Sequence, residues 1–185
     1  PGIWNAPPES WQWVMGVNFM GVVHGLQAFV PDMLGHGEPG HIVNTSSVVG
    51  VWTGDGSIYG VSKHAVTALT EGLYRDLRRQ DARLGVSLLL PALTATRINS
   101  GARNRPPALQ PSNQHPDMEK FMLEMDARYQ RDGMDPVRVG EIVIAAIRAG
   151  QFYVFTHEGT QRLVENRMRA MVDNGYPDLP PEGRR

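Results

Sequence analysis

A tyrosine and a lysine four positions apart, Tyr59 and Lys63, have the spacing in this sequence that most directly suggests chemistry. Side chains at positions i and i+4 project from the same face of a helix. A free phenol has a pKa of about 10, too high for an efficient base at neutral pH, but a neighbouring ammonium group favours the phenolate and lowers that pKa. The pair therefore predicts proton exchange between the Tyr59 hydroxyl and an alcohol or carbonyl oxygen.

Two more polar side chains, Ser46 and Ser47, stand where a predicted strand at residues 41–46 ends. The tyrosine and lysine open the next predicted helix, at residues 59–80. A Tyr-x-x-x-Lys match arises by chance in about one such chain in twenty, so the pair gains its weight from these surroundings. Ligands of open α/β sheets bind beyond the carboxyl ends of the strands, where these serines lie.

A long helix is predicted before that strand, at residues 11–34, with Ser10 as its N-cap. Apolar side chains recur at helical spacing, and the other faces are apolar as well. Between Glu9 and Asp32 only His24 can carry a charge. We expect this helix to be covered on more than one side, by a sheet and by a second subunit, with burial inside one subunit as the alternative.

The later part of the chain alternates between strand-like and helix-like segments. Asp135 and Pro136 form an N-cap and first-turn pair, and Gly150 closes the helix that they open. The further predicted elements are a strand at 85–90, helices at 117–131 and 136–149, a strand at 151–156 and a helix at 158–174. Helices alternating with strands predict an α/β fold with a parallel sheet.

Two segments are predicted to lie outside the regular core. Residues 97–130 contain many loop-forming residues, and we expect them to form a mobile substrate loop or lid. Arg103 and Arg105 within it are expected to be solvated loop charges, with contact to an anionic substrate as the alternative. The tail at residues 176–185 is expected to be disordered.

The composition excludes several classes of function. The formal net charge is −1, so the chain lacks the excess of positive charge that is typical of nucleic-acid-binding proteins. The absence of cysteine excludes disulfides and thiolate zinc sites. The six histidines show no metal-ligand spacing, so no metal site is expected. We also expect neither a membrane span nor a signal peptide, and a cytoplasmic location.

Four blocks in this sequence occur together in a known order. They are Trp13-Val14-x-x-Val17-Asn18 with Gly21, Ile42-Val43-Asn44-Thr45-Ser46-Ser47-x-x-Gly50, Tyr59-Gly60-Val61-Ser62-Lys63, and the segment from Pro91 to Thr96. With these blocks the chain resembles the classical short-chain dehydrogenase/reductase family from about residue 11 to residue 155. The resemblance implies a Rossmann-like, doubly wound parallel sheet, of which residues 1–175 would be the catalytic and substrate-binding part.

The resemblance also implies roles for individual residues. Tyr59 would be the general acid/base, Ser47 would donate a hydrogen bond to the substrate oxygen, and Asn18 would anchor a water in a proton relay. Lys63 would lower the pKa of the tyrosine, and Tyr59 and Lys63 would both contact the nicotinamide ribose region of the cofactor. Ser46 is the alternative catalytic serine, because it has the commoner spacing to the tyrosine, whereas Ser47 keeps the Ser-x-x-Gly pattern.

The implied cofactor is NAD or NADP. Thr96 and the backbone around Thr94 would contact its carboxamide, in a loop that begins with Pro91 and Ala92. The family has glycine where this chain has Ala92, which adds a methyl group close to the cofactor. The residue that distinguishes NAD from NADP follows a second strand that these 185 residues do not contain.

The glycine-rich turn that cradles the cofactor's pyrophosphate is also missing before residue 11. We therefore expect an incomplete Rossmann-like fold without its N-terminal βαβ part, and a 185-residue chain that is inactive alone. The first hypothesis is an NAD(P)-dependent oxidoreductase that interconverts a hydroxyl and a carbonyl on a small or lipophilic alcohol or ketone. The complete protein would be a homodimer or homotetramer. The alternatives are a non-catalytic remnant that serves as a dimerising or interaction module, and an extended-family epimerase or dehydratase.

Overall fold

A computed structural model describes residues 3–54, 56–111 and 118–175. Its centre is a parallel sheet with strand order β1-β2-β3, in which the strands are Gly40–Thr45, Leu84–Leu90 and Tyr153–Phe155. β1 pairs with β2 over its whole length, from Gly40 opposite Leu84 to Thr45 opposite Leu89. The predicted α/β class and parallel sheet are confirmed, and the strand at 85–90 lies within one residue of its predicted start.

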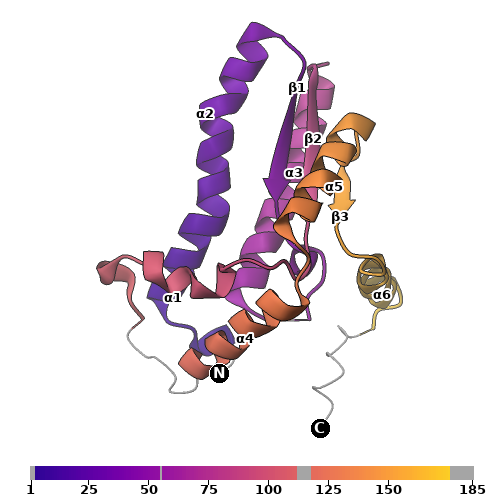
Figure 1. Cartoon of the computed structure of the whole chain (residues 1–185). Coiled ribbons are helices and arrows are strands. Elements are labelled where there is room, and N and C mark those ends of the chain that lie inside the picture. Colours follow the sequence, from indigo (N-terminus) through magenta and orange to yellow (C-terminus); the bar gives the residue numbers. More distant parts are fainter. Residues whose placement is uncertain (1–2, 55, 112–117, 176–185) are drawn as a thin grey trace.

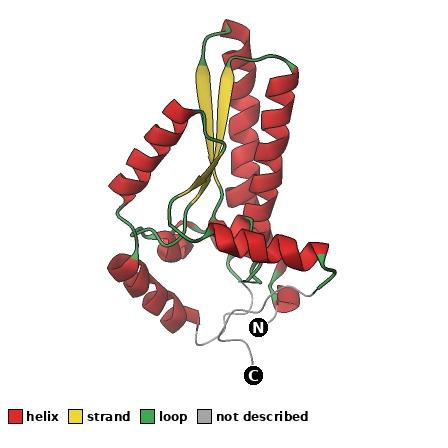
Figure 2. Ribbon diagram, turned by 90° about the vertical axis from the view of Figure 1, so that its right-hand side faces the viewer, coloured by secondary structure: helices red, strands yellow, loops and turns green. Residues whose placement is uncertain are grey.

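Helices cover both faces of this sheet (Figure 2). The helix α3 (Ile58–Arg79) joins β1 to β2, and α5 (Pro136–Ala149) leads into β3 on the opposite face (Figure 1). The remaining helices are α1 (Pro8–Met15), α2 (Gly21–His36), α4 (Met118–Asp132) and α6 (Gln161–Val172), with short 3₁₀ turns at Ile3–Asn5, Val48–Gly50, Ile98–Asn104 and Pro107–Leu109.

The central strand β2 is buried on both of its faces. On one face Leu84 and Val86 pack with Leu77 of α3, and the C-terminal half of α2 closes over this cluster. On the other face Leu89 packs with Ala146 of α5 and with β3. A strand covered on both faces is expected to be apolar at successive positions rather than at alternate ones, as this strand is.

The first long helix is irregular at the point where it carries Asn18. The chain is helical from Pro8 to His36, but Gly16–Met20 form a π-helical segment between α1 and α2. The long helix predicted at 11–34 is therefore present, but its π-helical segment was not predicted, because the spacing of apolar residues does not reveal one extra residue in a turn. The N-cap prediction was wrong: α1 starts at Pro8, so Ser10 lies inside the helix.

The same helix, Pro8–His36, is long and apolar enough to cross a membrane by length and composition alone. That criterion is weak, because core helices of soluble proteins also meet it. Here the helix packs along α3, and Asn18 donates a hydrogen bond to Ser62 of that helix, 3.1 Å away. The side-chain amide of Asn18 therefore has a hydrogen-bond partner within the protein.

Local signals set the ends of α5. The Asp135 carboxylate accepts a hydrogen bond from the backbone N–H of Val137, and Gly150 ends the helix with a left-handed conformation at φ 64°. Both features were predicted. The helix predicted at 117–131 is confirmed as α4, and the rest of the region at 97–130 is more regular than predicted, since its described residues include two 3₁₀ turns. The mobility predicted for that region stays a prediction, and the tail at 176–185 lies outside the described residues.

A polar contact links β1 and β2 to the residues just before β3, at the end of the sheet away from the serines. The Ser87 hydroxyl on β2 donates its proton to the backbone oxygen of Gln151, 2.6 Å away. It therefore accepts from Nε2 of His41 on β1, at 2.8 Å. Burial lowers the pKa of His41 below its usual value, so the folded protein favours the neutral imidazole.

The first prediction concerns His41 and acid stability. Because its pKa is lower in the folded state, the unfolded state binds a proton first as the pH falls. The contribution of His41 to stability is therefore full above about pH 6.5 and is lost as the pH falls through the lowered pKa. Thermal unfolding between about pH 7 and about pH 5 should show a smaller loss of melting temperature in His41→Gln than in the unaltered protein.

His24→Gln serves as the matched control, because His24 is an exposed histidine on α2. This control should keep the pH dependence of the unaltered protein. An unchanged pH dependence in His41→Gln would contradict the assignment.

Candidate functional site

The first turn of α3 places the tyrosine–lysine pair. Ser57 caps the helix, and its side chain accepts a hydrogen bond from the backbone N–H of Gly60, 3.0 Å away. Tyr59 and Lys63 then lie one turn apart, with the Lys63 ammonium 5.7 Å from the centre of the Tyr59 ring. This is the shared helix face that their spacing predicted.

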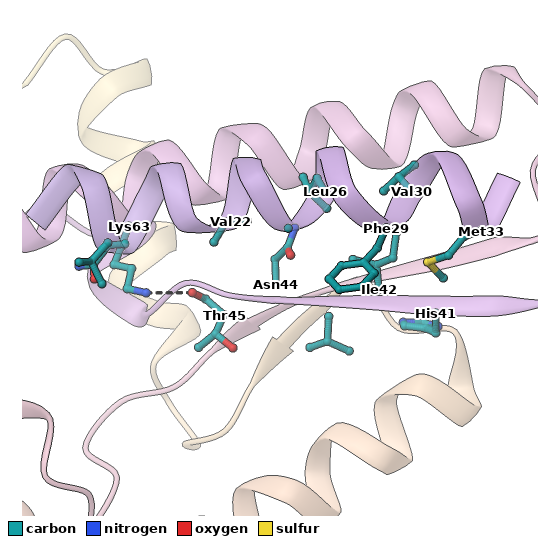
Figure 3. Close-up of a pocket in the computed structure, with 14 residues that line it drawn as sticks. Val22, Leu26, Phe29, Val30, Met33, His41, Ile42, Asn44, Thr45 and Lys63 are labelled. Carbon is teal, nitrogen blue, oxygen red and sulfur yellow. Dashed lines mark hydrogen bonds between the residues drawn. The ribbon is translucent and has the colours of Figure 1, made fainter.

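The Lys63 side chain reaches across to the end of β1. Its ammonium donates a hydrogen bond to the backbone oxygen of Thr45, 2.9 Å away (Figure 3). Burial lowers the pKa of Lys63 below its usual value, because removal from water disfavours the charged ammonium. The hydrogen bond to a carbonyl aims this amine at the carboxyl end of the sheet.

Asn18 is tied to the same helix turn by a two-bond chain. Its side-chain amide donates to the Ser62 hydroxyl at 3.1 Å, and that hydroxyl donates to the backbone oxygen of Tyr59 at 2.7 Å. Ser62 is completely buried between the two helices. The π-helical segment thus has a fixed position relative to the first turn of α3.

The two candidate serines have different surroundings. Ser46 is 1% exposed, and its hydroxyl donates to the backbone oxygen of Lys63, 2.8 Å away. Ser47 is 8% exposed, and its hydroxyl donates to the backbone oxygen of Pro91 at a longer 3.3 Å. The contacts of Ser46 hold β1 to α3, whereas Ser47 stands between the end of β1 and the loop after β2.

Three of the four predicted catalytic residues converge on one cavity of about 330 Å³. Asn18, Tyr59 and Lys63 supply polar groups to it. The rest of its wall comes from α1, the π-helical segment and the 3₁₀ turn after β2, through Trp13, Val14, Val17, Ile98, Gly101 and Asn104. Ser47 is not among the residues that line it. Only the family resemblance indicated that α1 would contribute to the site, and no sequence signal identified Ile98 or Asn104 as part of the cavity wall.

A larger cavity of about 560 Å³ lies between α2 and β1 (Figure 3). It is mostly apolar, with Leu26, Phe29 and Met33 directed from the helix towards the strand, and with Lys63 at one end. Among the described residues β1 pairs only with β2, so its other edge borders this cavity. The chemistry-bearing cavity is the smaller one, because Tyr59 lines only that one.

The loop that begins at Pro91 is held by the segment before α5. The backbone N–H of Ala95 donates to the oxygen of Met134, and the N–H of Met134 donates to the oxygen of Leu93, both at 2.9 Å. A side chain at Gly133 would stand 2.5 Å from the backbone nitrogen of Ala95. Glycine is therefore required where the two segments meet.

The residues expected to bind cofactor lie within this clamped loop. Thr94 donates to the oxygen of Ala92 at 3.3 Å, and the N–H of Thr96 donates to the oxygen of Thr94 at 2.7 Å. The side chain of Gln130 in α4 donates to the oxygen of Thr96 at 3.0 Å. The predicted carboxamide contacts are thus presented by a loop with its own backbone hydrogen bonds.

Arg105 is not the solvated loop charge that was predicted. Its guanidinium donates to the Ser10 hydroxyl at 3.1 Å and to the backbone oxygen of Leu109. Burial lowers its pKa, while the nearby Glu9 carboxylate acts in the opposite sense. Arg103 instead donates to backbone oxygens within its own 3₁₀ turn. Arg105 therefore ties the wall after β2 to α1, a contact over 95 residues that sequence spacing does not reveal.

The arrangement is suited to proton transfer at a substrate oxygen. A phenol near an ammonium, in the wall of a largely apolar cavity, can donate and accept a proton at one position, and such general acid/base help contributes about 10² to 10⁴ in rate. In the described part of the chain no group of three His, Asp or Glu side chains is placed to hold a metal ion.

Comparison with known proteins gives a consistent result. A family profile described as "short chain dehydrogenase" matches residues 3–106. A curated relative, the "CLA biosynthesis dehydrogenase/reductase" of Lactiplantibacillus plantarum, is 27% identical over 184 residues. That alignment covers 97% of this chain but only 64% of the relative, so the chain spans less than two thirds of the relative's length.

Solved structures share the fold. A short-chain dehydrogenase/reductase from Burkholderia phymatum in complex with NAD superposes with a TM-score of 0.90 at 38% identity, covering 97% of this chain and 64% of that one. A short-chain dehydrogenase from Burkholderia cenocepacia in complex with NADP superposes with a TM-score of 0.64 at 20% identity, covering 94% and 61%. The more distant similarity supports the fold alone.

The second prediction tests how tightly the serine segment is packed on α3. A methyl group at Gly50 would collide with the Ser46 hydroxyl and stand 2.8 Å from the backbone oxygen of Lys63. Gly50→Ala should therefore lower the free energy of unfolding by about 1–3 kcal/mol, measured by urea denaturation. Gly140→Ala is the matched control, because Gly140 is at an exposed position of α5 and a methyl group there meets nothing within 4 Å.

The control should raise stability by about 0.5–1 kcal/mol, since alanine is the better helix former. Equal stability of Gly50→Ala and the unaltered protein would show that the serine segment is free to move away from α3.

Proposed function

Because the chain belongs to the classical short-chain dehydrogenase/reductase family, we propose that it carries the catalytic site of an NAD(P)-dependent oxidoreductase that interconverts a hydroxyl and a carbonyl. One observation carries this proposal: Asn18, Tyr59 and Lys63 line the same cavity. This cavity opens at the carboxyl end of the sheet, where the ligands of such folds bind.

We assign the proton chemistry to Tyr59. Its phenol gives a proton to the carbonyl oxygen in reduction and takes one from the alcohol in oxidation. The Lys63 ammonium, 5.7 Å from the ring, favours the ionised phenol electrostatically. Ser47 is the hydrogen-bond donor to the substrate oxygen in this proposal, because its longer bond to Pro91 is easier to exchange than the contacts of the buried Ser46.

The residues present fit the nicotinamide end of the cofactor. In this proposal Lys63 and Tyr59 hold the ribose next to the ring, and Thr94 and Thr96 contact the carboxamide, in a loop that begins at Pro91 and Ala92. When bound, the cofactor supplies or accepts the hydride. Asn18 holds the turn of α3 that carries the tyrosine through Ser62, so it supports the same proton path.

The phosphate end of the cofactor has no such support in this part of the protein. The segment between β1 and α3 contains Gly50, Gly54 and Gly56, but it holds the proposed catalytic serine and a 3₁₀ turn, and it is not the short strand-to-helix turn that usually cradles a pyrophosphate in this fold. We propose that residues outside the 185-residue sequence supply the cradle, and that NAD and NADP are distinguished there.

The substrate in this proposal is a small or lipophilic alcohol or ketone. The wall of the catalytic cavity presents Trp13, Val14, Val17 and Ile98, and a volume of about 330 Å³ lies at the small end of ligand sites. Lys63 is the one charged side chain among the described residues that line it, which disfavours strongly anionic substrates. We propose a cytoplasmic location for this reaction.

A second subunit is part of the proposal. Met20 in the π-helical segment is 37% exposed and Leu34 on α2 is 36% exposed, and neither lines either of the two cavities, although both lie on the apolar helix Pro8–His36. A symmetric contact along this helix would cover them. The same apolar surface would also suit the alternative function, a non-catalytic dimerising module. Catalytic activity of the protein would exclude that alternative.

The third prediction tests the general acid/base. In the natural protein, Tyr59→Phe should lower turnover by about 10² to 10⁴, because only the hydroxyl is lost and the ring remains. Turnover is followed as oxidation of NADH and of NADPH with a panel of aliphatic and aromatic ketones. Tyr74→Phe, a tyrosine further along α3, is the matched control and should retain turnover. Undiminished activity in Tyr59→Phe would overturn the mechanism.

The fourth prediction concerns the 185-residue chain assayed alone. It should show no turnover in the same assay, because holding the cofactor in a reactive orientation contributes about 7 to 11 kcal/mol to such a step. Fusing a compatible glycine-rich βαβ segment upstream should restore turnover, and the fusion carrying Tyr59→Phe should remain inactive. Robust activity of the 185 residues alone would show that the cofactor's phosphates bind elsewhere.

A further inference from the structure

The helix α6 is linked to the segments around the site by the side chain of Arg167. No residue of α6 is buried, yet Arg167 reaches two other segments with the same guanidinium nitrogen. Its Nη1 donates to the backbone oxygen of Val51 at 2.9 Å and lies 2.8 Å from Nε2 of His64. These contacts span 116 and 103 residues of sequence.

The chemistry of the arginine defines the state of the histidine. A guanidinium has donors and no acceptor, so Nε2 of His64 must be the unprotonated nitrogen. The proton of the neutral ring is then on Nδ1, which donates to the backbone oxygen of Gly60 at 3.0 Å. A positively charged imidazole would place an N–H against the guanidinium, so this contact holds only one tautomer of the neutral ring.

The two segments that Arg167 joins are those that carry the proposed catalytic residues. Val51 is four residues after Ser47. His64 directly follows Lys63, and its partner Gly60 directly follows Tyr59. The guanidinium therefore connects the serine segment to the turn of α3 that carries the acid/base pair.

Buried contacts already join these segments. The Ser46 hydroxyl donates to the backbone oxygen of Lys63 and lies 3.0 Å from the Thr67 hydroxyl, and Gly50 packs closely against the backbone of Lys63. Arg167 adds a further link at Val51 and His64, and it is not among the residues that line the catalytic cavity.

We propose that Arg167 is a positioning residue for the oxidoreductase reaction proposed above, with His64 as its partner: the pair holds the serine segment and the catalytic turn of α3 at a fixed separation. The role depends on that proposed function. Substrate and cofactor do not need to touch either residue, so the loss of Arg167 should lower kcat more than it raises KM.

The test uses the natural protein with Arg167→Ala, Arg167→Lys and the control Arg169→Ala. Arg169 lies on the same helix and is exposed. In Arg167→Ala, kcat with the best ketone of the panel should fall about tenfold, the equivalent of one charge-assisted hydrogen bond, while KM changes less than about twofold. Arg167→Lys should recover part of the loss, because an ammonium can still donate to one of the two acceptors. Arg169→Ala should behave as the unaltered protein.

A second measurement does not depend on turnover. In protein labelled with ¹⁵N-histidine, the ring nitrogens of His64 should show the Nδ1–H tautomer by two-dimensional NMR, assigned by comparison with His64→Gln. Arg167→Ala should shift this signal towards the other tautomer, and Arg169→Ala should leave it in place. An Nε2–H tautomer in the unaltered protein would overturn the contact.

The outcomes separate the two proposals. A normal kcat in Arg167→Ala would overturn the positioning role, as would a loss of melting temperature with unchanged kcat per folded molecule, which describes a purely structural anchor. Absence of turnover in the unaltered protein would overturn the proposed function and the role of Arg167 in it. The His64 spectrum would still decide whether the contact exists.

Discussion

The packing of β1 against α3 through hydrogen bonds, rather than through apolar contacts alone, is the constraint on which the site depends. Asn44 donates to Thr70, and Ser46 donates to the backbone oxygen of Lys63, in a layer shielded from water. A buried polar group without a partner costs about 1–3 kcal/mol. Rotation or sliding of α3 would break several such bonds at once, so the helix has one permitted position, and the orientation of Tyr59 follows from it.

This arrangement divides the work between rigid and adjustable parts. The sheet and α3 fix the phenol and the amine, while the far wall of the catalytic cavity comes from α1 and from the 3₁₀ turn after β2. The contacts that hold the parts of this wall together include side-chain hydrogen bonds between Arg105 and Ser10 and between Ser100 and Asp126. Proton transfer is therefore supported by the core of the fold, whereas the shape offered to a substrate depends on contacts near the surface.

Sequence was most informative where structure depends on neighbours along the chain. The ends of α5 were predictable because Asp135, Pro136 and Gly150 each act within one turn, and the pairing of Tyr59 with Lys63 because i and i+4 always share a helix face.

Features that depend on distant segments gave no such signal. The contacts of Arg105 and Arg167 join segments about a hundred residues apart, and no spacing rule connects them. Sequence spacing could not decide which serine is catalytic, because the distance to Tyr59 favours Ser46 and the Ser-x-x-Gly pattern favours Ser47. The structure distinguishes Ser46 from Ser47 through burial and partners. The π-helical segment was not predicted because the spacing of its apolar residues fits both a regular helix and a π-helix.

The π-helical segment, Gly16–Met20, also has an evolutionary consequence. A π-turn contains one residue more than the regular helix around it, and each residue of a helix turns the chain by about 100°. Deletion of a single codon would restore a regular helix and swing everything before it by that angle, carrying Trp13 and Val14 off the cavity wall while α2 stays on the sheet. The reverse insertion would have built the wall in one mutational event.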